Sequence, residues 1–149
     1  MTLASPPLWT LAQHLSRDWP HLRAAERDSV VERERLRDIL AGIIPDDTSF
    51  VVFGSLARGE FTSGSDLDWT LLIDGRTEKS HPHAILKIIS ALAQGGAREP
   101  GPTGVFGNIA VSHPILHQIG GQDDTNRNTT QRILLLLESV AVSHAKAHE

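Results

Sequence analysis

Two aspartates, Asp66 and Asp68, stand two positions apart at the start of an apolar segment. In an extended strand such residues lie on one face, about 6.6 Å apart, so both carboxylates point away from Leu67 and Trp69, which face a core. Like charges side by side are unfavourable unless a cation lies between them. Mg2+ or Mn2+, shared with substrate phosphates, is the natural cation for such oxygen ligands. Taken alone, the pair is a weak signal, and the simpler interpretation is that Asp66 caps a loop and Asp68 is exposed.

A second feature precedes the aspartates: the apolar run 50–53 ends at Gly54-Ser55. A strand that turns into a helix at such a point aims free backbone N–H groups at an anion, and Gly54 leaves no Cβ in the way. The Ser55 hydroxyl and the Arg58 charge add to an anion site. A Gly-Ser pair by itself is most simply an ordinary turn. Together with the aspartates, however, it predicts a platform for phosphates and a metal.

The combined segment resembles the DNA polymerase β-type nucleotidyltransferase superfamily. Its spacing is similar to that of the minimal nucleotidyltransferases of toxin–antitoxin pairs. The resemblance is close over residues 50–74, follows the order of elements over 49–112 and does not reach residues 1–45. The residues that carry it are Gly54-Ser55, Arg58-Gly59-Glu60 and Ser65-Asp66-Leu67-Asp68.

The resemblance implies a nucleotidyltransferase, dependent on Mg2+ or Mn2+, that moves a nucleoside monophosphate from an NTP to a hydroxyl. ATP is the superfamily's common donor. Asp66 and Asp68 would be the catalytic, metal-holding pair. An acceptor hydroxyl would attack the α-phosphorus and pyrophosphate would leave. The nucleotide-binding residues predicted in this way are Gly54, Ser55, Arg58, Ser65 and Asn108.

One departure from the superfamily pattern concerns activity. Active members commonly carry a third carboxylate on a later strand, and the expected strand here, residues 105–112, contains no acid. Its one polar interior residue is Asn108, which brings no charge and cannot act as a base near neutral pH. A loop acid is the other source, and the candidates are Glu99, Asp123 and Asp124. The alternative function is therefore a catalytically inactive nucleotide-binding or regulatory module.

The hydrophobic pattern predicts the helices and strands that must position these residues. Helices are expected over 8–18, 21–42 and 81–94, strands over 49–53, 67–73 and 105–112, a short helix after residue 54, and a last helix from about 123 to 143. This order predicts an α+β fold with a small mixed β-sheet flanked by helices. Residues 1–45 would form an N-terminal helical extension and residues 46–149 the nucleotidyltransferase-like domain.

Composition limits the location and the partners. The chain has 149 residues, a formal net charge of −4 and no cysteine. It therefore lacks a global basic field for nucleic acid, thiolate zinc sites and disulfides. No apolar run approaches a membrane span and the N-terminus lacks a basic leader region, so a cytoplasmic protein is expected.

The apolar segment 131–142 bears on assembly. No single helical face accommodates all of its apolar residues, so a helix here is either buried on several sides or packed against a partner or a further domain. Burial against a partner is the favoured interpretation, with a homo-oligomer or a toxin partner as candidates. A protein acceptor is a further expectation from the minimal members. The base preference and the acceptor itself are not encoded in any residue pattern.

Overall fold

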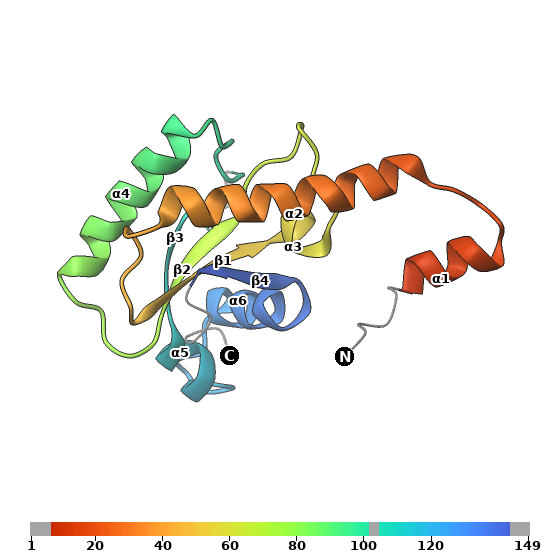
Figure 1. The fold of residues 1–149 in the computed structure, drawn as a ribbon. Coiled ribbons are helices and arrows are strands. Elements are labelled where there is room, and N and C mark those ends of the chain that lie inside the picture. Colours follow the sequence, from red (N-terminus) through yellow and green to blue (C-terminus); the bar gives the residue numbers. More distant parts are fainter. Residues whose placement is uncertain (1–6, 102–104, 144–149) are drawn as a thin grey trace.

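The computed structural model describes residues 7–101 and 105–143 and contains six helices and four strands in that part of the chain (Figure 1). In order, the elements are α1 Pro7–His14, α2 Pro20–Leu40, β1 Thr48–Phe53, α3 Gly54–Arg58, β2 Trp69–Ile73, α4 Ser80–Gln94, β3 Asn108–Val111, α5 Ser112–His117, α6 Asn126–Leu137 and β4 Ser139–Ser143. None of the described helices is long and apolar enough to cross a membrane.

The strands form one mixed sheet in the order β3-β2-β1-β4. The central strand β1 pairs antiparallel with both β2 and β4, and β2 pairs parallel with β3. All residues of β1 and β2 are buried, as their mostly apolar and β-branched residues predict for central strands. The expected α+β class with a small mixed sheet between helices is confirmed.

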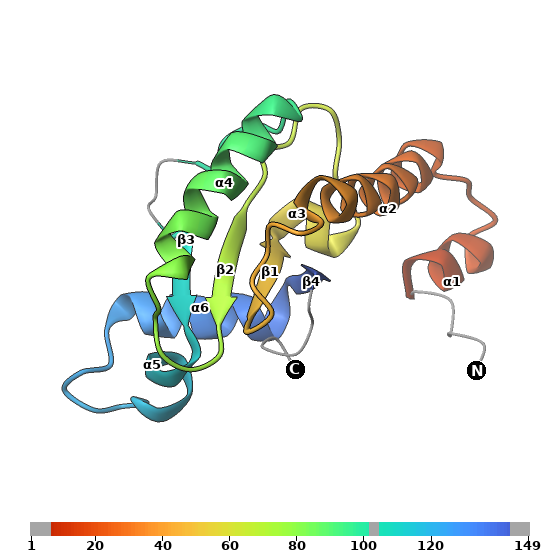
Figure 2. The ribbon, with the colours of Figure 1, turned by 60° about the vertical axis from the view of Figure 1, so that its left-hand side comes forward.

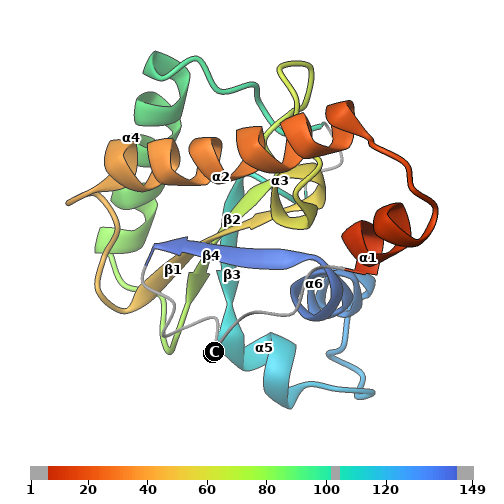
Figure 3. The ribbon, with the colours of Figure 1, turned by 45° about the vertical axis from the view of Figure 1, so that its right-hand side comes forward.

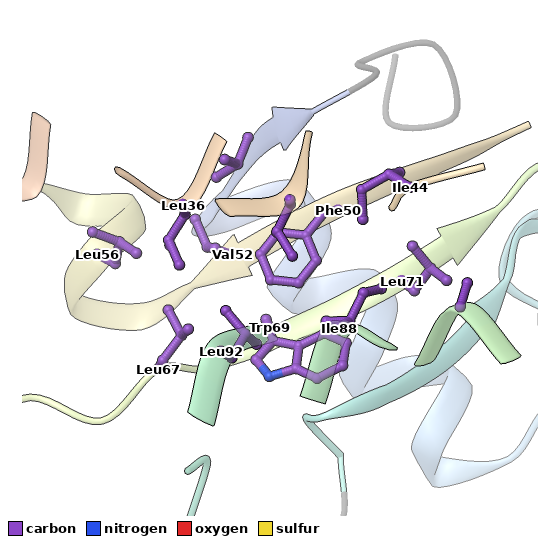
Figure 4. Packing of buried hydrophobic residues seen from close by; sticks show 13 residues of the cluster. Leu36, Ile44, Phe50, Val52, Leu56, Leu67, Trp69, Leu71, Ile88 and Leu92 are labelled. Atoms are coloured by element: carbon purple, nitrogen blue, oxygen red, sulfur yellow. The ribbon is translucent and has the colours of Figure 1, made fainter. Parts of the chain in front are cut away.

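Helices cover both faces of this sheet, as the turned view shows (Figure 2). The larger core lies between the sheet and the helices α2 and α4, where Phe50 and Trp69 stack with ring centroids 5.1 Å apart (Figure 4). Leu36 from α2 and Ile88 from α4 are fully buried in the same cluster. The smaller core lies on the other face and includes Val51, Phe53, Leu72, Ala110 and Ile115. Residues alternating along β1 thus enter different cores.

The two N-terminal helices, α1 and α2, make different packing contacts. α1 packs against α2 through Trp9, whose indole N–H donates to Glu26 at 3.0 Å and whose ring lies 4.3 Å from the Arg23 guanidinium. The C-terminal half of α2 contributes to the main core. The helical extension before the nucleotidyltransferase-like domain is therefore present, while its boundary at residue 45 stays a prediction.

The C-terminal part corrects one expectation. A helix reaching residue 143 was wrong, because α6 ends at Leu137 and residues 139–143 form the edge strand β4 (Figure 3). The backbone leaves helical geometry at Glu138, and Ser139 then pairs with Phe53. Pairing satisfies the free edge of β1, which a helix at this position would leave unpaired. The mixed apolar pattern of 131–142 is thus a helix followed by a strand.

Two strands are also shorter than expected. β2 begins at Trp69 rather than at residue 67, and β3 spans Asn108–Val111 rather than 105–112. Residues from Ser112 onward form α5, with Pro114 in its first turn, where the missing N–H costs no helical hydrogen bond.

Candidate active site

The turn after β1 has the predicted form. β1 ends at Phe53 and α3 begins at Gly54, which has φ +59°, a region that residues with a Cβ rarely adopt. A Cβ at this position would also lie 3.3 Å from Oδ2 of Asp68. α3 ends at Gly59 in the left-handed conformation. Gly54 is therefore required by its own backbone and by the close approach of Asp68.

α2 holds this turn in place from outside. Nη1 of Arg33 donates to the carbonyl oxygen of Leu56 in α3 at 2.8 Å. The Ser29 hydroxyl donates to the carbonyl oxygen of Ala25 and accepts the N–H of Phe61 at 3.0 Å. The bonds to Leu56 and from Phe61 tie the middle of α3 and the segment after it to one long helix, so the N-terminal extension positions the site.

The two aspartates lie just before β2 and still follow strand alternation. Leu67 and Trp69 are buried in the main core, while Asp66 is exposed and Asp68 is half-buried. Two backbone bonds fix this extended approach: the N–H of Phe53 donates to the carbonyl oxygen of Asp68 at 3.0 Å, and the N–H of Leu67 donates to that of Arg98 at 3.2 Å. Both carboxylates consequently face away from the main core, as predicted.

The turn and the aspartates border a common depression of about 500 Å³, here named the carboxylate hollow. It brings together five of the seven predicted site residues and adds residues from α6, from the junction between α6 and β4, and from the approach to β3. Its lining residues are Gly54, Ser55, Arg58, Asp66, Asp68, Val105, Phe106, Thr130, Leu134 and Glu138.

The electrostatics of the hollow favour a cation. Burial raises the pKa of Asp68, and the charges of Asp66 and Glu138 raise it further. Each of these causes disfavours the ionised carboxylate, and a positive ion in the hollow would offset them. Within the described ranges no three His, Cys, Asp or Glu side chains cluster closely enough to hold a metal ion by themselves. Two carboxylates completed by substrate phosphates nevertheless suit Mg2+, which is often bound in that way.

Glu138 is the site residue that the sequence interpretation missed. It lies between α6 and β4, and the pairing of Ser139 with Phe53 brings it beside the turn at Gly54. It forms an ion pair with Arg58, which also binds Glu60 at 2.9 Å. The hydrogen bonds that Arg58 donates to Glu60 and Glu138, that to Glu60 first, raise the pKa of Arg58. The sequence contained a signal for Glu138, which is the single charged residue between Ile133 and Ser143 in an otherwise mostly apolar segment.

Two predicted nucleotide-binding residues do not line the hollow. The Ser65 hydroxyl accepts the N–H of Thr62 at 3.1 Å and shapes the turn before Asp66. Asn108 is paired with Thr70 in the β2–β3 register, and its Oδ1 accepts the N–H of Ile109 at 2.8 Å. Their roles in nucleotide binding stay predictions.

The acids considered as third carboxylates also lie elsewhere. Glu99 borders a separate cavity on the α4 side. Asp124 accepts the N–H of Gly120 at 2.8 Å and binds Arg132 at 3.2 Å, and these bonds, that from Gly120 first, lower its pKa. It thus closes the loop before α6, and Asp123 lies in the same loop outside the hollow.

Comparison with known proteins agrees with this geometry. No curated protein and no solved structure matches the chain. A family model described as a nucleotidyltransferase domain matches residues 33–131, about two-thirds of the chain, from the middle of α2 into α6. The matched range contains the turn at Gly54 and both aspartates. The chain therefore belongs to the nucleotidyltransferase domain family, within the polymerase β-type superfamily.

Proposed function

We propose that this protein is a Mg2+-dependent nucleotidyltransferase that moves a nucleoside monophosphate from an NTP, with ATP as the donor, to a hydroxyl acceptor. The observation that carries the proposal is the carboxylate hollow, where the Gly54-Ser55 turn and both aspartates meet. A phosphate-binding turn beside a pair of carboxylates is what phosphoryl transfer requires, because its catalysis depends on positioning and charge neutralisation.

Each residue has a role that follows from its place. Asp66 and Asp68 would hold the metal, which when bound supplies charge neutralisation for the triphosphate. Ser55 and the N–H groups at the start of α3 would orient the terminal phosphates, since the first N–H groups of a helix lack intrahelical acceptors. Arg58 adds a cation at the rim of the hollow, where a triphosphate would compete with Glu138 for it.

Glu138 is our candidate for the third acid that the strand at Asn108 lacks. It borders the hollow beside Arg58 and its charge acts on Asp68. Its carboxylate comes from the opposite edge of the sheet, since β4 and β3 flank β1 and β2. A third acid at the border of the hollow supports an active enzyme over the inactive module.

The partners remain proposals of the same kind. A toxin or another protein as acceptor, a homo-oligomer through residues 131–142 and a cytoplasmic location stay predictions from the sequence and the resemblance.

The decisive experiment measures transfer of label from α-32P-ATP with Mg2+ or Mn2+ and host lysate. We expect labelling by the wild type and by Asp123→Ala, which changes an acid outside the hollow, and none by the Asp66→Ala, Asp68→Ala double variant. Labelling that survives the double change would show the assigned site to be wrong. Binding of ATP without transfer to any acceptor would favour the non-catalytic module.

Glu138 is tested by its Gln variant beside Glu60→Gln, which also removes one carboxylate partner of Arg58. We expect the Mg2+ concentration for half-maximal transfer to rise about 10-fold in Glu138→Gln alone, in line with losses on removing a metal site's supporting groups. Equal effects of the two variants would mean that Glu138 acts only through Arg58.

A further inference from the structure

A second cavity of about 540 Å³ lies on the α4 side of the sheet, outside the carboxylate hollow. Its walls come from the approach to β2, the last turns of α4 and the segments on either side of residues 102–104. Most of them are apolar, including Leu67, Trp69, Ile89 and Ala97. Its volume falls within the range that holds small organic ligands.

The cavity borders the predicted metal-holding aspartate. A Cβ at Gly101, which lines the cavity, would lie 3.8 Å from Oδ2 of Asp66. Phe106 lines both the cavity and the hollow. The strands lie side by side in the order β4-β1-β2-β3, and one end of the sheet contains the end of β1 and the starts of the other three strands. At that end the residues follow in the order Glu138 (before β4), Gly54 (after β1), Asp68 (before β2) and Gly107 (before β3). The Gly54-Ser55 turn and the cavity therefore lie on opposite sides of the aspartates.

We propose that this cavity binds the acceptor, and that the acceptor is a small, uncharged molecule with a hydroxyl on an apolar body. This inference rests on the proposed nucleotidyl transfer. In such a transfer the attacking and leaving oxygens lie roughly in line across the α-phosphorus. Pyrophosphate at the Gly54-Ser55 turn leaves on the side of α3, so the hydroxyl must approach from the side of β3 and α4, where the cavity lies.

The reaction balances with the NTP as co-reactant. The acceptor oxygen forms a bond to the α-phosphorus while the bond from that phosphorus to the oxygen bridging the β-phosphate breaks. Pyrophosphate leaves with the electron pair, and the hydroxyl proton passes to solvent. The product is the acceptor carrying a nucleoside monophosphate.

The charge of the cavity selects among acceptors. Its ionisable residues are Arg98 and Glu99, one of each sign, and Nη1 of Arg98 already donates to the carbonyl oxygen of Gly64 at 3.0 Å. A polycationic amino sugar would meet one carboxylate and one guanidinium, and a nucleic acid strand would meet no basic stripe. Apolar walls with few charges instead favour a neutral ring or chain.

The test fills the cavity without touching the hollow. Ala93 is an exposed residue of α4 that lines the cavity, so Ala93→Trp places an indole into it, whereas Lys87→Trp places one on the same helix away from the lining. The first probe is 2-naphthol, a neutral hydroxyl compound, whose binding is measured by saturation-transfer NMR. The second is α,β-methylene-ATP with Mg2+, a non-transferable donor, whose binding is measured by calorimetry.

We expect 2-naphthol to bind the wild type and Lys87→Trp in the presence of the ATP analogue, and its affinity to fall at least 10-fold in Ala93→Trp. Affinity for the analogue should be the same in all three proteins. Equal naphthol binding by Ala93→Trp, or no binding by the wild type, would overturn the proposal. Competition between naphthol and the analogue would also overturn it, because the cavity would then hold the nucleoside. If the analogue fails to bind the wild type, the proposed function fails separately from the cavity.

Discussion

The sheet face under α2 and α4 carries the larger hydrophobic core, whereas the face under α5 and α6 carries the smaller one and is partly open. In the described part of the chain the first core contains 13 buried hydrophobic residues and the second contains five. On the second side Ile133, Leu136 and Leu137 of α6 are exposed. The carboxylate hollow opens on this sparsely covered side.

The difference separates stability from ligand binding. The dense core holds β1 and β2 in register, and α2 adds hydrogen bonds to the segment that carries the turn. The open face leaves the hollow beside the aspartates accessible. Side chains of the larger core should therefore dominate the free energy of unfolding, and those around the hollow should dominate binding of the metal and the NTP.

The largest expected effect comes from making the same substitution on both faces. Leu71→Ala, at a fully buried position of the main core, should lower the free energy of unfolding by about 2–5 kcal/mol because it leaves a cavity. Leu136→Ala, where the side chain is 79% exposed, should change it by less than about 0.5 kcal/mol. Urea unfolding measures both values.

This comparison also tests the predicted interface through residues 131–142. If Leu136→Ala destabilises the protein increasingly as protein concentration rises, α6 is buried in an oligomer, and the open face is closed by a second copy. Sedimentation equilibrium of the wild type would then show the same assembly.

The next effect comes from the turn at Gly54-Ser55. Gly54→Ala and Gly59→Ala both place a Cβ at positive φ, which costs roughly 1–2 kcal/mol. Only at Gly54 does the Cβ approach the Asp68 carboxylate, while Gly59 has no atom within 4 Å. Gly54→Ala should thus be more destabilising in thermal unfolding and should also weaken binding of Mg-ATP. Equal losses of stability in the two variants would mean that the Asp68 side chain moves away from the new Cβ at no cost in free energy.

A smaller effect of opposite sign is expected at Asp68. The pKa of Asp68 is raised in the folded protein, so the folded state binds the carboxyl proton more tightly than the unfolded state does. The ionised carboxylate therefore destabilises the metal-free fold. Asp68→Asn should raise the free energy of unfolding at pH 7, by about 1 kcal/mol or less because solvent screens a half-exposed group. The gain should disappear as pH falls through the raised pKa, where wild-type Asp68 becomes protonated. Asp46→Asn, at an exposed position outside the hollow, should show no such gain.

The smallest effect on stability is expected for Glu138→Gln. The ion pair with Arg58 is partly exposed, and such pairs contribute between zero and about 1 kcal/mol. Thermal unfolding should therefore change little even though the Mg2+ dependence of transfer shifts. A loss above about 2 kcal/mol would instead make Glu138 a structural clamp between α3 and β4.

Much of the fold and of the site follows from local patterns. The apolar run 50–53, the turn at Gly54 and the i,i+2 spacing of Asp66 and Asp68 each depend on a few neighbouring residues, so they predicted β1, α3 and the direction of both carboxylates. The expectation failed at residues 139–143. An apolar stretch after a helix is compatible with either helix or strand, and its choice depends on whether a strand edge is available.

The sequence by itself therefore determined the turn at Gly54-Ser55, the paired aspartates and the family, because these lie within one continuous segment. The tertiary structure alone decided which further residues meet them. Pairing of Phe53 with Ser139 joins positions far apart in the chain and brings Glu138 to the hollow, while the β2–β3 register places Asn108 beside Thr70. Such contacts are set by strand pairing and core packing across the whole domain, and no local spacing of residues encodes them.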